Sequence, residues 1–118
     1  MPRTDRENPI QRAIIDYLRH VLPGCLIHHS PNELGMSGQA AARQIAKAKH
    51  NGMLPGFPDL VVAHDGGIMF LEVKAEGNYM TENQRDVHLT LASLGHRVAV
   101  VRSIDDVREL LGKWGIPT

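Results

Sequence analysis

Apolar and polar positions along the chain alternate with helical period in some segments and with strand period in others. Apolar residues recur every three or four positions over residues 8–22, which predicts an amphipathic helix ending at Pro23-Gly24. Asn8 and Pro9 fit its start, because asparagine is a good N-cap and proline is preorganised at the first helical position. Further helices are predicted at residues 39–50, 81–94 and 105–113, with Ser37, Thr81 and Ser103 as caps, and strands at residues 25–28 and 97–102.

The middle of the chain predicts a β-hairpin. Two apolar runs, residues 60–64 and 67–73, flank Asp65-Gly66, and Asp-Gly favours a type I′ turn because both positions tolerate positive φ. This turn pairs His64 with Gly67 and brings Asp59 opposite Glu72. Apolar residues on both faces of the two runs indicate central strands that are covered on both sides.

Two carboxylates and an amine meet at the open end of this hairpin. Opposed residues have Cβ atoms about 4.5–5.5 Å apart, so Asp59 and Glu72 are close, and Lys74 shares their face because side chains alternate along a strand. Carboxylates this close repel each other, whereas Mg²⁺ takes one or two carboxylates together with waters and phosphate oxygens. The lysine could orient or deprotonate a water, or offset charge on a phosphate. The simpler alternative is that Asp59 only begins the strand and that Glu72 and Lys74 form an ion pair on the surface. The apolar residues on both faces of the two runs argue against it.

These residues resemble a known nuclease signature. Gly-Phe-Pro-Asp-Leu at residues 56–60 and Phe-Leu-Glu-Val-Lys at residues 70–74 resemble the Pro-Asp…Glu-X-Lys pattern of the PD-(D/E)XK nuclease superfamily. More narrowly, the chain resembles a stand-alone VRR-NUC (virus-type replication-repair nuclease) domain. The resemblance also includes Glu7, Asn32-Glu33, residues 52–56 and Thr81 to Gln84. It implies one α/β domain over residues 1–118, with a restriction-endonuclease-like core whose central mixed β-sheet is flanked by helices.

The resemblance also implies a role for each site residue. Asp59 and Glu72 would hold Mg²⁺ or Mn²⁺, with the main-chain carbonyl of Val73 as a further ligand. Lys74 would serve the attacking water. The flanking helices would complete the catalytic site with two more side chains, Glu7 and Gln84.

Helix capping is an alternative role for the two flanking residues. Glu7 and Gln84 each stand three positions after a threonine, as in a capping box. For Gln84, capping and a catalytic role are compatible. For Glu7, capping would place Pro9 inside the helix and cost a hydrogen bond, which favours the catalytic role.

The expected function is that of a metal-dependent DNA endonuclease, structure-specific for branched DNA such as four-way junctions or flaps. Paired incisions need two protomers related by a two-fold axis, and stand-alone members of the family resemble dimeric Holliday junction resolvases, so a homodimer is expected. Candidate interface residues are Leu34, Met36, Met53 and Leu54. A non-catalytic nucleic-acid-binding module on the same fold and a ribonuclease stay open as alternatives.

Composition limits these expectations. The formal net charge is zero, with 13 basic and 13 acidic residues, whereas DNA-binding proteins usually present a basic surface. The densest basic stretch holds Arg43, Lys47, Lys49 and His50.

Cysteine and histidine usage argues for a reducing compartment and against zinc. The lone cysteine, Cys25, excludes an internal disulfide and suits the cytoplasm of a bacterial or phage-infected cell. The histidines lack zinc-site spacing, and the adjacent His28 and His29 would face opposite ways in a strand. The N-terminus is too charged for a signal peptide, and no apolar run approaches the length of a membrane span.

Overall fold

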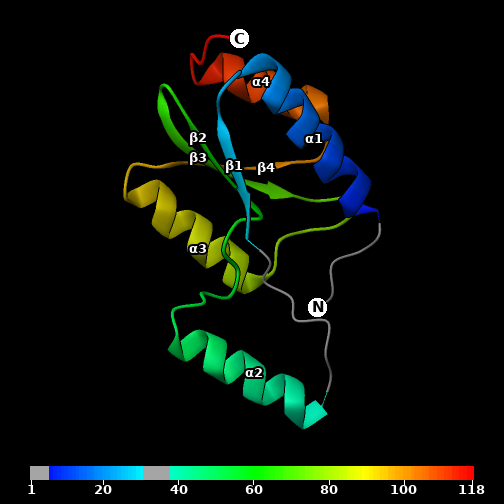
Figure 1. Ribbon diagram of the computed structural model, residues 1–118, viewed down its shortest axis with the longest axis vertical. Helices are drawn as coiled ribbons and strands as arrows, with labels where there is room; N and C mark the ends of the chain where they lie inside the picture. The colour runs from blue at the N-terminus through cyan, green and yellow to red at the C-terminus, as the bar shows by residue number, and fades with distance from the viewer. Residues whose placement is uncertain (1–5, 31–37) are drawn as a thin grey trace.

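A mixed four-stranded sheet lies between helices in the computed structural model, which describes residues 6–30 and 38–118 (Figure 1). The strands are β1 (Leu26–His29), β2 (Leu60–His64), β3 (Gly67–Val73) and β4 (Arg97–Val101), in the order β1-β2-β3-β4. The β1–β2 and β2–β3 pairs are antiparallel and the β3–β4 pair is parallel. The helices are α1 (Glu7–Val21), α2 (Gly38–His50), α3 (Glu82–Ser93) and α4 (Ile104–Lys113). The predictions made for Thr4, Asn32-Glu33, Leu34, Met36 and Ser37 fall outside the described residues.

The hairpin has the predicted register. His64 pairs with Gly67 across the Asp65-Gly66 turn, and the ladder continues to the pair Leu60–Leu71. The predicted turn type is wrong, because a type I′ turn needs positive φ at both Asp65 and Gly66 and neither residue has it; the positive φ lies at Gly67, at +126°. Asp59 and Glu72 follow this last pair, so the register sets them opposite each other where the two strands separate.

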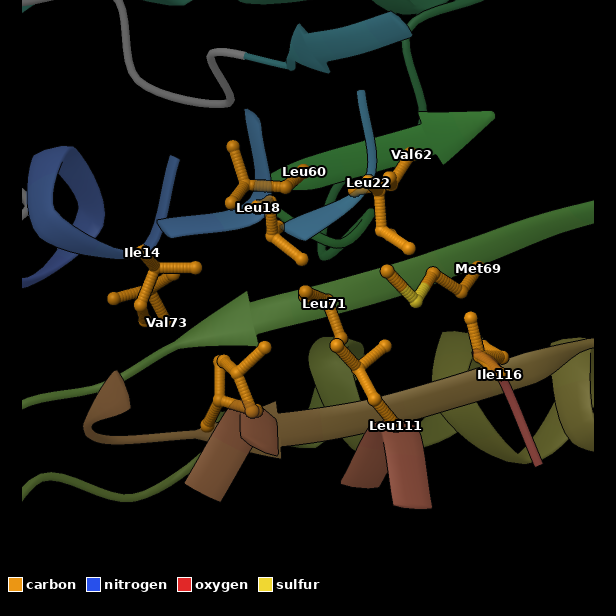
Figure 2. Close-up of a cluster of buried hydrophobic side chains, with 12 residues drawn as sticks. Ile14, Leu18, Leu22, Leu60, Val62, Met69, Leu71, Val73, Leu111 and Ile116 are labelled. Atoms are coloured by element: carbon orange, nitrogen blue, oxygen red, sulfur yellow. The ribbon is translucent and has the colours of Figure 1, made fainter. Parts of the chain in front are cut away.

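One face of the sheet carries the hydrophobic core. Side chains at alternate positions of β2 and β3 point toward α1 and α4, and Figure 2 shows them packed against the side chains of these helices. The fully buried members from the two strands are Leu60, Val62, Met69, Leu71 and Val73. Burying each such side chain contributes about 1.5–3 kcal/mol, so this face holds the sheet and the two helices together.

The opposite face is covered only in part. The helix α3 packs on β4, while Val61, Ala63 and Phe70 are half-buried and Ile68 is 49% exposed. The prediction of strands covered on both sides is therefore correct for the core face and wrong at the turn end of this second face. A single helix is about 10 Å wide, so α3, which lies on β4, does not cover four strands spaced about 4.8 Å apart.

The first helix begins earlier than predicted. Its N-cap is Arg6 rather than Asn8, and Pro9 occupies the third helical position. The first four N–H groups of a helix have no intrahelical acceptor, so proline in this turn loses no hydrogen bond. The strand β1 is shifted by one residue, since it begins at Leu26 and ends at His29. Within the described residues, no helix is long and apolar enough to cross a bilayer.

The segment that joins α2 to β2 docks on α3 through a glycine. Gly56 has a φ of +84°, and a Cβ there would lie 2.6 Å from the carbonyl carbon of Asn83 and 2.7 Å from the backbone nitrogen of Gln84. The next residue, Phe57, packs edge-on against Phe70, with ring centroids 5.6 Å apart. The backbone of this segment therefore touches the first turn of α3, just before the chain reaches Asp59.

We expect Gly56→Ala to destabilise the fold more than Gly24→Ala. Both glycines have a φ of +84°, so both substitutions carry the left-handed penalty of about 1–2 kcal/mol. A Cβ at Gly24 meets nothing within 4 Å, whereas one at Gly56 collides with backbone. Urea denaturation of both variants measures the difference, and an equal loss of unfolding free energy would show that the close approach is absent.

Candidate active site

The buried ionisable side chains of the described chain gather at one end of the sheet. They are Glu7, Asp59, Glu72, Lys74 and His88, each 9% exposed or less. Taking a charge out of water costs several kcal/mol unless it finds compensating partners. Four of the five are residues that the sequence singles out for chemistry, and the fold concentrates them where the hairpin strands separate.

Asp59 is held at the start of β2 by contacts on both sides. Its main-chain carbonyl accepts from the Ser30 N–H at 2.8 Å, and its Oδ2 accepts from the Val73 N–H at 2.8 Å. The carboxylate therefore lies beside the end of β3. Because a strand residue directs its N–H and C=O to the same side, the Val73 carbonyl faces the side on which Asp59 lies.

Glu72 is 1% exposed and receives two side chains from α3. Gln84 donates from Nε2 to Oε2 of Glu72 at 3.4 Å. His88 places its Nε2 3.6 Å from the other oxygen, Oε1. Gln84 and His88 are four residues apart and so share one face of the helix, which is turned toward Glu72.

Gln84 also caps α3. Its Oε1 accepts from the Thr81 N–H at 2.9 Å, while its own N–H donates to the Thr81 hydroxyl at 3.2 Å, which completes a capping box. Since Oε1 serves the cap, the amide group is oriented with Nε2 toward Glu72. Capping and contact with the acidic pair coexist, as the sequence allowed.

Glu7 lies in the first turn of α1 at the same end of the sheet. Its Oε2 accepts from the Ala75 N–H and from Nδ2 of Asn78, both at 3.2 Å. Glu7 is the first residue of the helix, not the third, so the capping-box interpretation of this residue is wrong. The carboxylate instead holds the chain directly after Lys74, whose side chain is 9% exposed and whose N–H donates to the Val101 carbonyl at 3.1 Å.

Sequence reasoning missed His88. Burial lowers the pKa of this imidazole, Asp59 raises it, and Lys74 lowers it. Two of the predicted site residues, Asp59 and Lys74, therefore act on this ring. Its Nε2 is buried and has no hydrogen-bond partner, because 3.6 Å to Glu72 is too long. The available signal was its spacing, four residues after Gln84 on a predicted helix.

His28 and His29, the two histidines discussed in the sequence analysis, lie on β1 and are exposed. The register places His28 on the face of Val61 and His29 on the face of Leu60. They face opposite ways, as predicted, and both side chains are exposed to solvent.

The donor set suits a hard divalent cation. Asp59 and Glu72 are buried, adjacent in register and close to a main-chain carbonyl, that of Val73. In the part of the chain that the structure describes, no three His, Cys, Asp or Glu side chains converge on one point. A cation here would therefore take two carboxylates and complete its shell with carbonyl, water or phosphate oxygens, as Mg²⁺ does.

We expect the unfolding free energy to fall as the pH drops below about 6.5, through His88. Its pKa is lowered in the folded state, so the unfolded chain binds more protons there, and stability present above the unfolded pKa is lost on acidification. Urea denaturation of wild type and His88→Gln in metal-free buffer should give curves that diverge between pH 7.5 and 5.5. Replacing the exposed His50 by Gln is the matched control, and a His88 variant that follows it in parallel would contradict the expectation.

The chain is similar to proteins of one family. The family model of the VRR-NUC domain matches residues 3–105. Two solved structures share the fold, both with a TM-score of 0.66. A "VRR_NUC domain protein" is 23% identical, with 96% of this chain and 90% of that chain covered, and a "VRR_NUC domain" is 24% identical, with 94% and 99% covered.

Comparison with curated proteins finds no match. The shared architecture is a PD-(D/E)XK-type nuclease fold, a mixed sheet flanked by helices. Because the family model covers most of the sequence and the fold agrees with it, the chain belongs to the VRR-NUC family of nuclease domains.

Proposed function

We propose that this VRR-NUC domain is a metal-dependent DNA endonuclease that hydrolyses phosphodiester bonds in branched DNA. The observation that carries the proposal is the burial of Asp59, Glu72 and Lys74 at one end of the sheet. A module that only binds nucleic acid gains nothing from hiding an acidic pair, because buried carboxylates lose solvation and repel each other. Metal-assisted hydrolysis of a phosphodiester bond, in contrast, uses such a pair to hold the cation.

Asp59 and Glu72, with the carbonyl of Val73, would hold Mg²⁺ or Mn²⁺. Such a cation, when bound, polarises the phosphate and lowers the pKa of water. The Val73 N–H holds the Asp59 carboxylate and the Gln84 amide holds that of Glu72, so little rearrangement is needed for binding.

Lys74 would supply the positive charge next to the attacking water. Its ammonium leaves the strand on the same face as Glu72, where it can orient the water or offset charge that develops on the phosphate. Glu7 would act through position, because its carboxylate holds Ala75 and thereby the backbone that carries Lys74.

We expect Asp59→Asn and Glu72→Gln to abolish cleavage of four-way junction, flap and linear DNA in Mg²⁺ or Mn²⁺. Each change removes half of the proposed carboxylate pair and also relieves its repulsion, so the fold should persist. Gel assays measure cleavage and calorimetric titration measures Mn²⁺ binding. Wild-type Mn²⁺ affinity in either variant would exclude the proposed ligands, and cleavage of matched RNA instead of DNA would favour a ribonuclease.

Lys74→Ala serves as the contrast in the same assays. It should bind Mn²⁺ like wild type, because an ammonium does not ligate a cation, yet lose about 10²–10⁴-fold in rate. Lys74→Arg should not restore the rate, since guanidinium has another geometry and does not deprotonate. Wild-type turnover by Lys74→Ala would remove the lysine from the mechanism.

The proposal includes a homodimer, because one site of this kind cuts one strand and a junction needs two cuts. Exposed apolar side chains could form a self-complementary surface. Leu54, one of the residues predicted for the interface, is 52% exposed. Leu26 and Ile68 are 74% and 49% exposed, and both pair with Ala63 in the sheet, so they form one row on the partly covered face.

Light scattering at micromolar concentration should give about twice the chain mass of 13.1 kDa. Leu54→Glu should shift the protein toward the monomer, because a buried unpaired carboxylate opposes the interface. Leu94→Glu is the matched control, since Leu94 is similarly exposed, at 67%, but lies at the end of α3. A wild-type monomer that still makes paired cuts in junctions would refute the dimer.

A further inference from the structure

The helix α2 stands apart from the rest of the described molecule. Figure 1 shows it below the sheet, away from α1, α3 and α4. Only Ala41 is buried among its 13 residues. Isolated helices of this length are marginal in water, so a helix in this position is expected to gain stability from something it binds.

The charge on α2 has one sign. The helix carries Arg43, Lys47 and Lys49, with His50 at its end, and contains no Asp or Glu. The whole chain balances 13 basic and 13 acidic residues, so the remainder has an excess of acid. The neutral total therefore conceals a positively charged helix on a slightly acidic body.

Three of these residues form a basic stripe, defined here as Arg43, Lys47 and His50. They follow each other at spacings of four and three residues, so they share one helix face, and all are exposed. Seven residues of helix extend about 10 Å. Phosphates along one strand of B-DNA rise about 3.4 Å each, so the stripe spans about three of them.

The composition of α2 favours the backbone of a duplex over other partners. The helix has no aromatic residue on which the bases of a single strand could stack. Its remaining side chains are mostly alanine, which offers no hydrogen bonds to base edges. Gln39 and Gln44 are the two uncharged polar side chains of α2, so most of the contact would be independent of sequence. A second α2 would be repelled by like charge.

The connection to α3 and β2 couples α2 to the candidate active site. After α2 ends at His50, the chain reaches Gly56, whose backbone touches the first turn of α3, and then Phe57, which packs on Phe70. Asp59 follows two residues later. We propose that α2 binds the phosphate backbone of a DNA duplex beside the bond that is cut, an inference that rests on the proposed function and names the part of the chain that holds its substrate.

The test variant combines Arg43→Gln and Lys47→Gln, the Arg and Lys of the basic stripe, with Lys49→Gln, which removes the remaining lysine of α2. Fluorescence anisotropy in metal-free buffer gives its affinity for a DNA duplex at 50–200 mM salt. The slope of log K against log salt is negative, and its magnitude falls by about 0.9 with each lost phosphate contact, so the magnitude should decrease by about two to three. In Mn²⁺ at low salt, the variant should keep its turnover at saturating DNA and show a raised KM.

The matched control combines Arg12→Gln, Arg19→Gln and Lys113→Gln, which remove the same charge from exposed positions of α1 and α4. It should keep the wild-type slope. A slope unchanged in the α2 variant, or lowered equally in the control, overturns the proposal. So does a loss of binding that accompanies a changed mass in light scattering, because α2 would then join copies of the chain. An equal loss of affinity for a single strand of the same length overturns the assignment to duplex.

The two proposals fail in different ways. A wild type that cleaves no DNA, while the α2 variant shows the reduced slope, refutes the nuclease activity and supports the contact. A wild type that cleaves, beside an α2 variant with the wild-type slope, refutes the contact alone.

Discussion

The hydrogen bond from the Val73 N–H to the Asp59 carboxylate, 2.8 Å long, sets the geometry on which the candidate site depends. It lies where β2 and β3 separate, beyond the last backbone pair of the hairpin. There it replaces a ladder contact with a contact to a charge, which is stronger than a neutral one. The bond keeps Asp59 beside Glu72 although the two carboxylates repel each other.

The other constraint comes from α3, whose first two turns serve the fold and the site together. The Thr81 box satisfies two of the orphan N–H groups of the helix, those of Thr81 and Gln84, and the same Gln84 amide turns its nitrogen toward Glu72. One turn later His88 approaches the second oxygen. Gln84 both caps α3 and contacts the Glu72 carboxylate. A shift of α3 would therefore disturb the cap and the site together. Gly56 matters for the fold and for the site as well, because it lets the segment before β2 touch the first turn of α3.

Charge distribution explains how a chain of zero net charge can serve as a nuclease domain. The acidic residues of the site would repel phosphate until a cation was held there, whereas α2 carries three basic side chains and no acidic one. Separating the two keeps the basic side chains from pairing with the buried carboxylates. The total charge of a sequence does not reveal such a separation, whereas the position of the helix does.

Local rules were enough for much of this protein. The Asp65-Gly66 turn determines the hairpin register, and the register alone brings Asp59 opposite Glu72. The motif then pointed to Lys74, and helix capping pointed to Gln84. Each of these depends on residues near in sequence, and the register is as predicted although the turn is not of type I′, because the loop still has two residues.

The rest was decided by tertiary packing. His88 reaches Glu72 only because α3 lies on the second face of the sheet, so its spacing of four residues from Gln84 does not by itself predict that contact. Glu7 does not form the capping box that its spacing from Thr4 allowed, because α1 begins at Glu7 itself; its carboxylate accepts from the Ala75 N–H, 68 residues away in the chain. The position of α2 away from the sheet likewise does not follow from its sequence of alanine and lysine residues. Spacing along a chain specifies which side chains share a face, but only the packing of helix on sheet specifies what that face meets.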